Sequence, residues 1–274
     1  MTRFPMTKFP MTRIIHAELL RLVRRRPMAY TAAAALLFSV VATLTVFSTA
    51  RDAGAGPASR RAGTTVAALA EHGGGTEAFA VGASFVGFLV FVTIIALVAS
   101  EFSGGTFRAV LLRNPHRLQV LVGKLAGILL VAAGVVALAE LFTFAVSLAV
   151  APGQDVSTSD WFSLSSVGAG LRDYVTVLGG VAGWAVFGTT LAVIFRSAPL
   201  ALGVGFAWAG PFENIIVDSW QAGYRWFPGQ VLASLIQGGT TELGIGRAVL
   251  TATLYAAMAA AASLVLVSRR DVTA

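Results

Sequence analysis

Glu140 is the residue best placed for chemistry, because it is the one acid well inside a long apolar run. An ionisable side chain at such a position is costly to bury and marks a functional site by default. Thr143 and Ser147 follow at i+3 and i+7, so all three lie on one face of a helix. This polar stripe has two interpretations: it faces a translocation path or a subunit interface, or it hydrogen-bonds to a neighbouring helix for packing alone.

The motifs of soluble enzymes are absent from the sequence. The phosphate-binding pattern G-x-x-x-x-G-K-[ST] fails at both ends, because Leu125 follows Gly123-Lys124 and Leu118 occupies the position of the first glycine. The chain has no Cys, and its three His residues all lie outside the apolar runs. We therefore expect no catalytic residue, no metal site and no bound cofactor; the chain is not an enzyme by itself.

The elements that position these residues are membrane-spanning helices. The chain is 56% hydrophobic and 12% charged, whereas soluble domains are about 25% charged. A helix needs about 20 apolar residues to cross a membrane, and the continuous runs do not alternate as barrel strands do. We predict an all-α integral membrane protein with a single transmembrane domain over residues 1–274, whose six spans are Met28–Thr49, Ala78–Ser100, Leu118–Val150, Tyr174–Phe195, a short fifth at Ala198–Phe212, and Ile245–Val267.

The basic residues indicate the orientation of these spans. If both termini are cytoplasmic, 14 of the 20 Lys and Arg residues lie on the inner side, which is the bias expected of cytoplasmic helix ends. Topology and anionic lipid headgroups thus explain the net charge of +7. We expect a multi-pass protein of the bacterial inner (cytoplasmic) membrane that contacts the lipid bilayer and no nucleic acid.

An amphipathic helix is predicted before the first span, over residues 12–26. Ile15, Leu19, Leu22 and Val23 share one side, and charged residues occupy the other. Such a helix can lie in the cytoplasmic interface with its apolar face in the acyl boundary. A simple basic flank of the first span is the alternative.

The loops on the outer side differ in character. We expect a flexible connector at 51–76, which ends in Gly73-Gly74-Gly75, and a Ser-rich loop at 152–170 with Trp161 and Phe162 at the membrane interface. The segment 213–244 is either a plain outer loop or a re-entrant segment, because it contains a short apolar stretch after Pro228-Gly229.

Small residues and tight turns predict how the spans pack. Gly123 with Gly127, and Gly179 with Gly183, are spaced for close helix contact. Arg196-Ser197 forms a short turn before Pro199, which predicts an antiparallel hairpin of spans four and five.

The inner segment 101–124 carries the strongest signal. Gly104-Gly105 allows a turn, and Thr106 is placed to cap a short helix over 107–113. Phe107, Val110 and Leu111 form the apolar face of this helix, which we expect to be exposed to a partner protein. Asn114-Pro115 ends the helix. Lys124 follows two turns after Arg117 and is placed to snorkel to the cytoplasmic headgroups.

At these residues the chain resembles the ABC-2 type permeases, the membrane subunits of a class of ATP-binding-cassette exporters. The inner loop of that family reads approximately E-x(3)-G-T-x(6)-R-x-P-x-R-x(6)-K. This chain has the same residue types in the same order and spacing: Glu101, Gly105, Thr106, Arg113, Pro115, Arg117 and Lys124. The resemblance extends over the N-terminal helix, the six spans, Phe227-Pro228-Gly229 and the basic end at Arg269-Arg270.

The resemblance implies a permease driven by a separate ATPase. The loop 101–117 would be the cytoplasmic coupling helix, and its coupling residues would be Glu101, Gly105, Thr106, Phe107, Arg108, Arg113, Pro115 and Arg117. Two ATPase copies would hold the ATP and Mg, and a second permease chain, identical or related, would complete the path. The segment 213–244 would be re-entrant. A self-contained secondary transporter and a non-transporting membrane partner of an ATPase are the alternatives.

Overall fold

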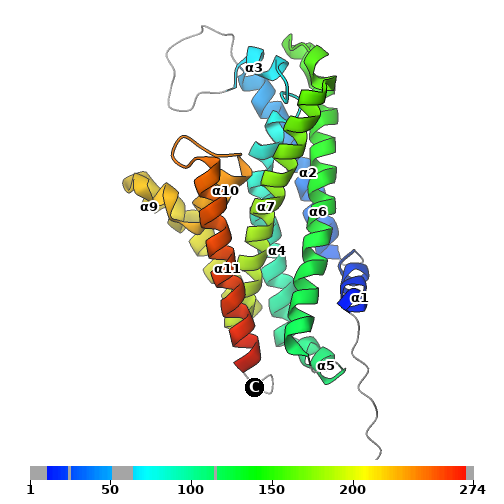
Figure 1. Cartoon of the computed structure of the whole chain (residues 1–274), viewed down its shortest axis with the longest axis vertical. Helices are drawn as coiled ribbons and strands as arrows, with labels where there is room; N and C mark the ends of the chain where they lie inside the picture. Colours follow the sequence, from blue (N-terminus) through cyan, green and yellow to red (C-terminus); the bar gives the residue numbers. More distant parts are fainter. Residues whose placement is uncertain (1–10, 24–25, 51–63, 114–115, 270–274) are drawn as a thin grey trace, which may run out of the picture.

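The computed structural model describes residues 11–23, 26–50, 64–113 and 116–269, and this part of the chain is helical without a β-strand (Figure 1). The helices are α1 (Met11–Val23), α2 (Arg26–Thr49), α3 (Val66–Ala70), α4 (Glu77–Ser103), α5 (Thr106–Arg113), α6 (Arg117–Val150), η1 (Ala151–Gln154), η2 (Ser159–Phe162), α7 (Leu164–Phe195), α8 (Ala198–Ala207), η3 (Trp208–Phe212), α9 (Glu213–Ser219), η4 (Gln221–Arg225), α10 (Pro228–Ile236) and α11 (Ile245–Arg269).

Six segments of the described residues are long and apolar enough to cross a membrane, which confirms the predicted number of spans. The fourth begins at Leu164, ten positions before its predicted start at Tyr174, because the helix continues through the charged pair Arg172-Asp173. Ser163 caps this helix by accepting a hydrogen bond from the backbone N–H of Ser166 (3.2 Å).

The fifth span is longer than predicted, because it continues past Phe212 to Ser219. The π-helical turn η3 joins α8 to α9 and contains Pro211, which lacks the N–H that a regular helix uses at this position. Residues 213–219 are therefore helix, and not the start of a loop as the sequence indicated. The predicted tight turn at Arg196-Ser197 is confirmed, with Arg196 in the left-handed conformation at φ 51°.

The bundle has two distinguishable ends. Figure 1 shows α5 at one end and α3, η1 and η2 at the other, and we call these the α5 end and the α3 end. The turn between α7 and α8 lies at the α5 end, since the Arg196 guanidinium stands 5.7 Å from the ring centre of Phe102.

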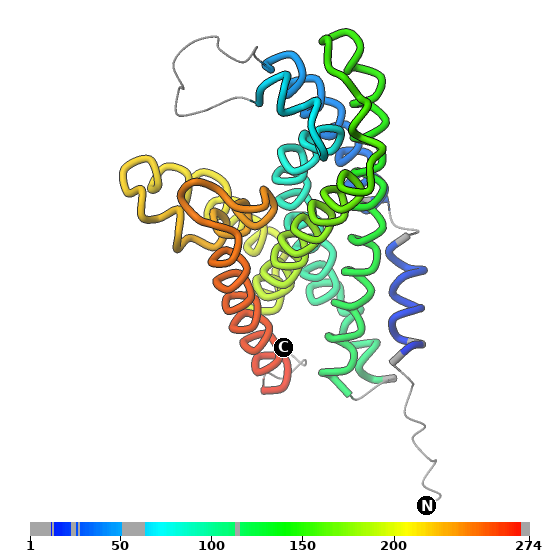
Figure 2. Tube along the Cα trace, turned by 45° about the horizontal axis from the view of Figure 1, so that its top comes forward, coloured from blue at the N-terminus to red at the C-terminus, as the bar shows by residue number. Residues whose placement is uncertain are grey.

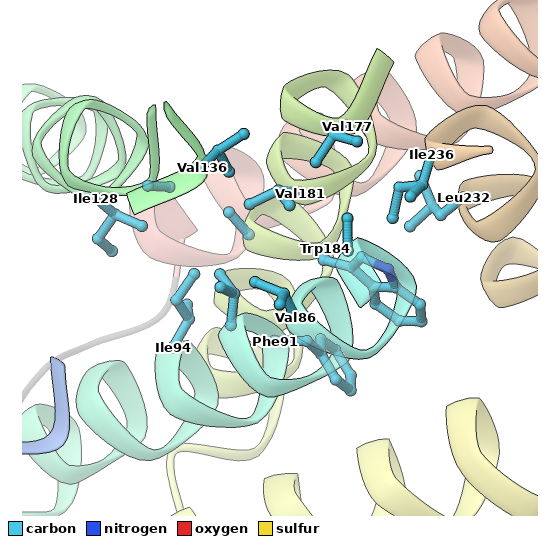
Figure 3. Close-up of a cluster of buried hydrophobic side chains, with 14 of the residues drawn as sticks. Val86, Phe91, Ile94, Ile128, Val136, Val177, Val181, Trp184, Leu232 and Ile236 are labelled. Carbon is cyan, nitrogen blue, oxygen red and sulfur yellow. The ribbon is translucent and has the colours of Figure 1, made fainter. Parts of the chain in front are cut away.

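The main core lies between α4, α6, α7 and α10. Figure 3 shows its side chains converging from these four helices, with Ile94, Ile128, Val181 and Ile236 among them. Burial of such side chains contributes about 1.5–3 kcal/mol each in water, but in lipid the driving force is close packing and not exclusion from water.

Glycines on α7 allow α10 to pack against it. A Cβ on Gly183 would collide with Leu232, a Cβ on Gly180 would collide with Ile236, and Gly179 faces Leu235. The predicted contact at Gly179 and Gly183 is thus confirmed, and the partner is the nine-residue helix α10.

The α3 end is closed by a second, smaller core. Trp161 is buried there and donates its indole N–H to the carbonyl oxygen of Leu69 (2.9 Å). Gly75 stands against Phe144 and Trp161, and Gly74 stands against the Leu69 backbone. The expected interface position is therefore wrong for Trp161, although Phe162 is exposed. Gly73–Gly75 serve close packing and not flexibility; residues 51–63 of that predicted connector lie outside the described residues.

Helix α1 lies beside α6 in both views (Figures 1 and 2). Gly127 makes this approach possible, because a Cβ there would stand 3.1 Å from the Cβ and Cγ of Glu18. Leu22 is buried and Ile15 and Leu19 are half-buried, as expected of the apolar face. The predicted contact at Gly127 is confirmed with α1 as its partner.

Candidate functional site

Helix α5 follows α4 after a two-residue turn, as the sequence predicted. Gly105 has φ +70°, a conformation that favours glycine. Thr106 is the first residue of α5, and its hydroxyl donates to the carbonyl oxygen of Glu101 (3.3 Å). The hydroxyl therefore links α5 to the last turn of α4 instead of forming the predicted cap.

Phe107 lies inside the protein, and its expected exposure to a partner is wrong. Its side chain is 2% exposed, and its ring centre stands 4.4 Å from that of Phe102. Val120 and Leu121 of α6 complete the same small core. A helix of eight residues is not stable by itself, so α5 depends on contacts with the rest of the protein. The burial of Phe107 is one of these contacts. Phe107 thus fixes α5 to the bundle.

The exposed residues of α5 whose side chains are described are Thr106, Arg108, Ala109, Val110 and Leu112. Leu112 is 81% exposed, although the sequence did not assign it to the exposed apolar face. Of the three residues that it did assign, Phe107 is buried, Leu111 is half-buried and Val110 is 42% exposed. The side chain of Arg113 and residues 114–115, including the predicted Pro115, lie outside the described residues. Arg117 begins α6 and is half-buried.

Four charged side chains form a closed cluster near the α5 end, which we call the ionic ring: Glu18, Arg21, Glu101 and Lys124. The Lys124 Nζ stands 2.9 Å from Glu18 Oε1 and 2.7 Å from Glu101 Oε2. Arg21 stands 2.6 Å from Glu101 Oε1 and 3.4 Å from Glu18 Oε2. Each acid therefore contacts both bases.

The ionic ring changes the interpretation of two predicted residues. Glu101 is 5% exposed and Lys124 is 4% exposed. The predicted snorkelling of Lys124 is wrong, because its ammonium group is held between two carboxylates. The ring joins α1, α4 and α6, and the removal of one partner would leave a buried charge uncompensated. The sequence signal was available, since Glu18 lies on the predicted amphipathic helix and had no assigned partner.

Glu140 and its stripe face the interior of the bundle. Glu140 is half-buried, and its Oε1 would stand 3.2 Å from a Cβ on Gly170 of α7. Thr143 and Ser147 are fully buried, and their hydroxyls have no hydrogen-bond partner among the described residues. Glu140 thus lies toward α7, and Thr143 and Ser147 are enclosed by protein. The two interpretations of the stripe both stay predictions.

Two further acids lie toward the α3 end, and the sequence did not single them out. Glu77 begins α4, and Asp173 of α7 accepts a hydrogen bond from Thr76 Oγ1 (3.1 Å). Both line a cavity of about 660 Å³ together with Gln237 and Thr240. The described residues contain no group of His, Cys, Asp and Glu able to hold a metal ion.

Glu213 is a third acid that the sequence did not single out. It is fully buried, and its carboxylate accepts hydrogen bonds from the backbone N–H groups of Gly229 and Gln230 (3.2 Å each). These groups begin α10, where N–H groups lack partners within the helix and attract negative charge. Pro228 at the first helical position was a signal that a helix begins there.

These features define the class of the protein: a multi-pass membrane protein that is helical throughout the described residues, with buried charges at Glu101, Lys124 and Glu213. Residues 60–273 match a family described as Protein of unknown function (DUF2705), and the chain belongs to that family. No curated protein matches the sequence.

Proposed function

We propose that this chain is the permease subunit of an ATP-driven exporter of the ABC-2 type, with the ATPase on a separate chain. The observation that carries the proposal is α5, a short helix at one end of the bundle that is fixed from inside by Phe107 and presents Leu112 outward. A helix that only connected two spans would not need an exposed leucine held in a fixed position. The loop pattern from Glu101 to Lys124 supports the same proposal.

The mechanism would be the transmission of movement. Closure of the ATPase would push the exposed face of α5, and Phe107 and the turn at Gly105 would pass the push to α4. The ionic ring would move α1 and α6 together with α4, because each acid contacts both bases. Rigid contacts of this kind are what a coupled transition requires.

The remaining parts of the complex follow from the same proposal. Two ATPase copies would bind ATP and Mg, and two permease chains would enclose the path in the bacterial inner membrane, with both termini cytoplasmic. Helix α10 would be a re-entrant segment. Its nine residues correspond to roughly 14 Å of helix, about half of the hydrocarbon thickness.

The test is to look for an ATP-binding-cassette gene beside this one, to copurify its ATPase with this chain, and to measure ATP hydrolysis in vesicles. We expect Leu112→Asp to reduce ATPase capture at least about tenfold, since it places a charge in a docking contact. Leu164→Asp is the matched control, because Leu164 is 87% exposed at the α3 end. Equal capture of both variants would contradict the assignment of α5.

The same reconstitution separates the alternatives. Transport by the chain alone, without nucleotide, would favour a secondary transporter. A stable ATPase complex that moves no substrate in a broad export screen would favour a non-transporting partner.

A further inference from the structure

An apolar cavity of about 250 Å³ lies between α4, α7, α8 and the start of α10. Its walls include Phe91, Trp184, Trp208, Val204 and Gly229, and Glu213 lines the same cavity. The ring centres of Phe91 and Trp184 stand 4.9 Å apart, and Figure 3 shows the two side chains next to each other at the edge of the core. The cavity therefore combines aromatic surfaces with one acid.

The charge of Glu213 is hydrogen-bonded but has no counter-ion. No Lys, Arg or His in the described part of the chain pairs with it, whereas all four ion pairs of that part belong to the ionic ring. Two N–H groups at a helix start and the Trp208 side chain stabilise the carboxylate, yet the helix start carries only about half a positive charge and the indole is neutral. Buried charges in proteins are normally paired with an opposite charge.

The chemistry of the walls selects the kind of cation. Mg²⁺ and Ca²⁺ need about six or more oxygen ligands, and this cavity offers one carboxylate among apolar and aromatic groups. A hydrated inorganic ion would lose its water without replacement. An organic cation with an apolar body, in contrast, is attracted to aromatic ring faces and would place its charge near Glu213.

We propose that this aromatic cavity is a binding site for a monovalent organic cation with an apolar body, such as a quaternary ammonium compound. The ligand fills the space between Phe91, Trp184 and Trp208 and supplies the missing counter-ion of Glu213. The site is formed within one chain and needs no ATPase, so the inference stands separately from the coupling role of α5.

The test is a binding titration of the whole chain in lipid nanodiscs with benzyltrimethylammonium. Its neutral carbon isostere, neopentylbenzene, has the same shape and no charge. We expect saturable binding of the cation and at least about tenfold weaker binding of the isostere. Equal binding of the two compounds would overturn the proposal, because the cavity would then recognise apolar shape alone.

Two pairs of variants locate the site. Glu213→Gln removes the charge and should weaken cation binding at least about tenfold, whereas Glu242→Gln removes an exposed acid and should not. Ala209→Leu fills the cavity while it leaves the Glu213 carboxyl group in the protein, and it should abolish binding; Ala207→Leu adds the same group at an exposed neighbouring position. Unchanged cation binding by Ala209→Leu would overturn the proposal even if Glu213→Gln failed to fold.

Failure of this inference and failure of the proposed function are distinguishable. Absence of cation binding together with the expected loss of ATPase capture in Leu112→Asp would overturn the cavity assignment and leave the coupling role of α5 supported.

Discussion

The ionic ring and Glu213 are two solutions to the burial of an acid in the same bundle. In the ring, Glu101 has two basic partners, and these come from α1 and α6. Glu213 is hydrogen-bonded by the N–H groups at the start of α10 and by the Trp208 side chain, has no basic partner among the described residues, and lines a cavity. The difference teaches that paired charges here join helices, whereas the acid without a counter-ion is positioned where a ligand can reach it.

The largest expected effect is on the ring. Lys124→Met leaves the buried Glu101 and the half-buried Glu18 with one base between them, so we expect a loss of about 3–5 kcal/mol in the free energy of unfolding. Unfolding in mixed detergent micelles measures it. Arg108→Met is the matched control, because Arg108 is exposed on α5. If the two variants were equally stable, Lys124 in the ionic ring would contribute no more to stability than the exposed Arg108.

The second-largest effect is expected for the packing of α10 on α7. This packing positions the backbone N–H groups that donate hydrogen bonds to Glu213. Gly183→Ala places a Cβ against Leu232, and we expect a loss of about 1–3 kcal/mol by the same unfolding measurement. The control is Gly168→Ala, also on α7, where the added Cβ meets nothing within 4 Å. That change should be neutral or slightly stabilising. A neutral Gly183→Ala would show that α10 is not tightly held.

Removal of the Glu213 charge should cost less than removal of a ring member. Glu213→Gln keeps the shape of the side chain and one acceptor oxygen, so we expect a loss of about 1 kcal/mol, typical of a weakened helix cap. Thermal unfolding of the purified protein measures it. A loss as large as that of Lys124→Met would mean that Glu213 is also a structural charge, and the comparison would fail.

The smallest effect is expected at the buried hydroxyls of the Glu140 stripe. Thr143 has no hydrogen-bond partner among the described residues, so Thr143→Val should leave stability unchanged or raise it by up to about 1 kcal/mol. Thr190→Val is the control, because Thr190 donates to the carbonyl oxygen of Ala259 on α11 (3.1 Å) and its loss should destabilise. Impaired transport in a stable Thr143→Val protein would favour the path interpretation of the stripe.

The number of spans could be predicted from the sequence, because a long apolar run is recognised from the order of the residues alone. The sequence did not predict contacts between residues that are far apart in the chain and adjacent in the fold. Phe107 and Leu112 are both apolar residues of one short helix, and the positions of α4, α6, α7 and α11 decide that Phe107 is buried. Lys124 could be placed near the cytoplasm but not between Glu18 and Glu101, since those residues are far apart in the chain.

Glu213 shows a further reason for failure. Pro211 interrupts the apolar run and indicates a loop, although a π-helical turn carries the helix past it. The carboxylate therefore lies at the start of α10, 16 residues away in the sequence from Gly229. Such a tertiary cap has no local pattern and can be found only from the fold.

The length of α4 gives the ionic ring a mechanical consequence. This helix has 27 residues, which at 1.5 Å per residue is roughly 40 Å. If the ring end acts as a pivot, a tilt of about 5° displaces the opposite end by about 3.5 Å over that length. Phe91 lies near the middle of this lever and would travel about half as far, so a small rotation at α5 is enough to reshape the aromatic cavity without unfolding any helix.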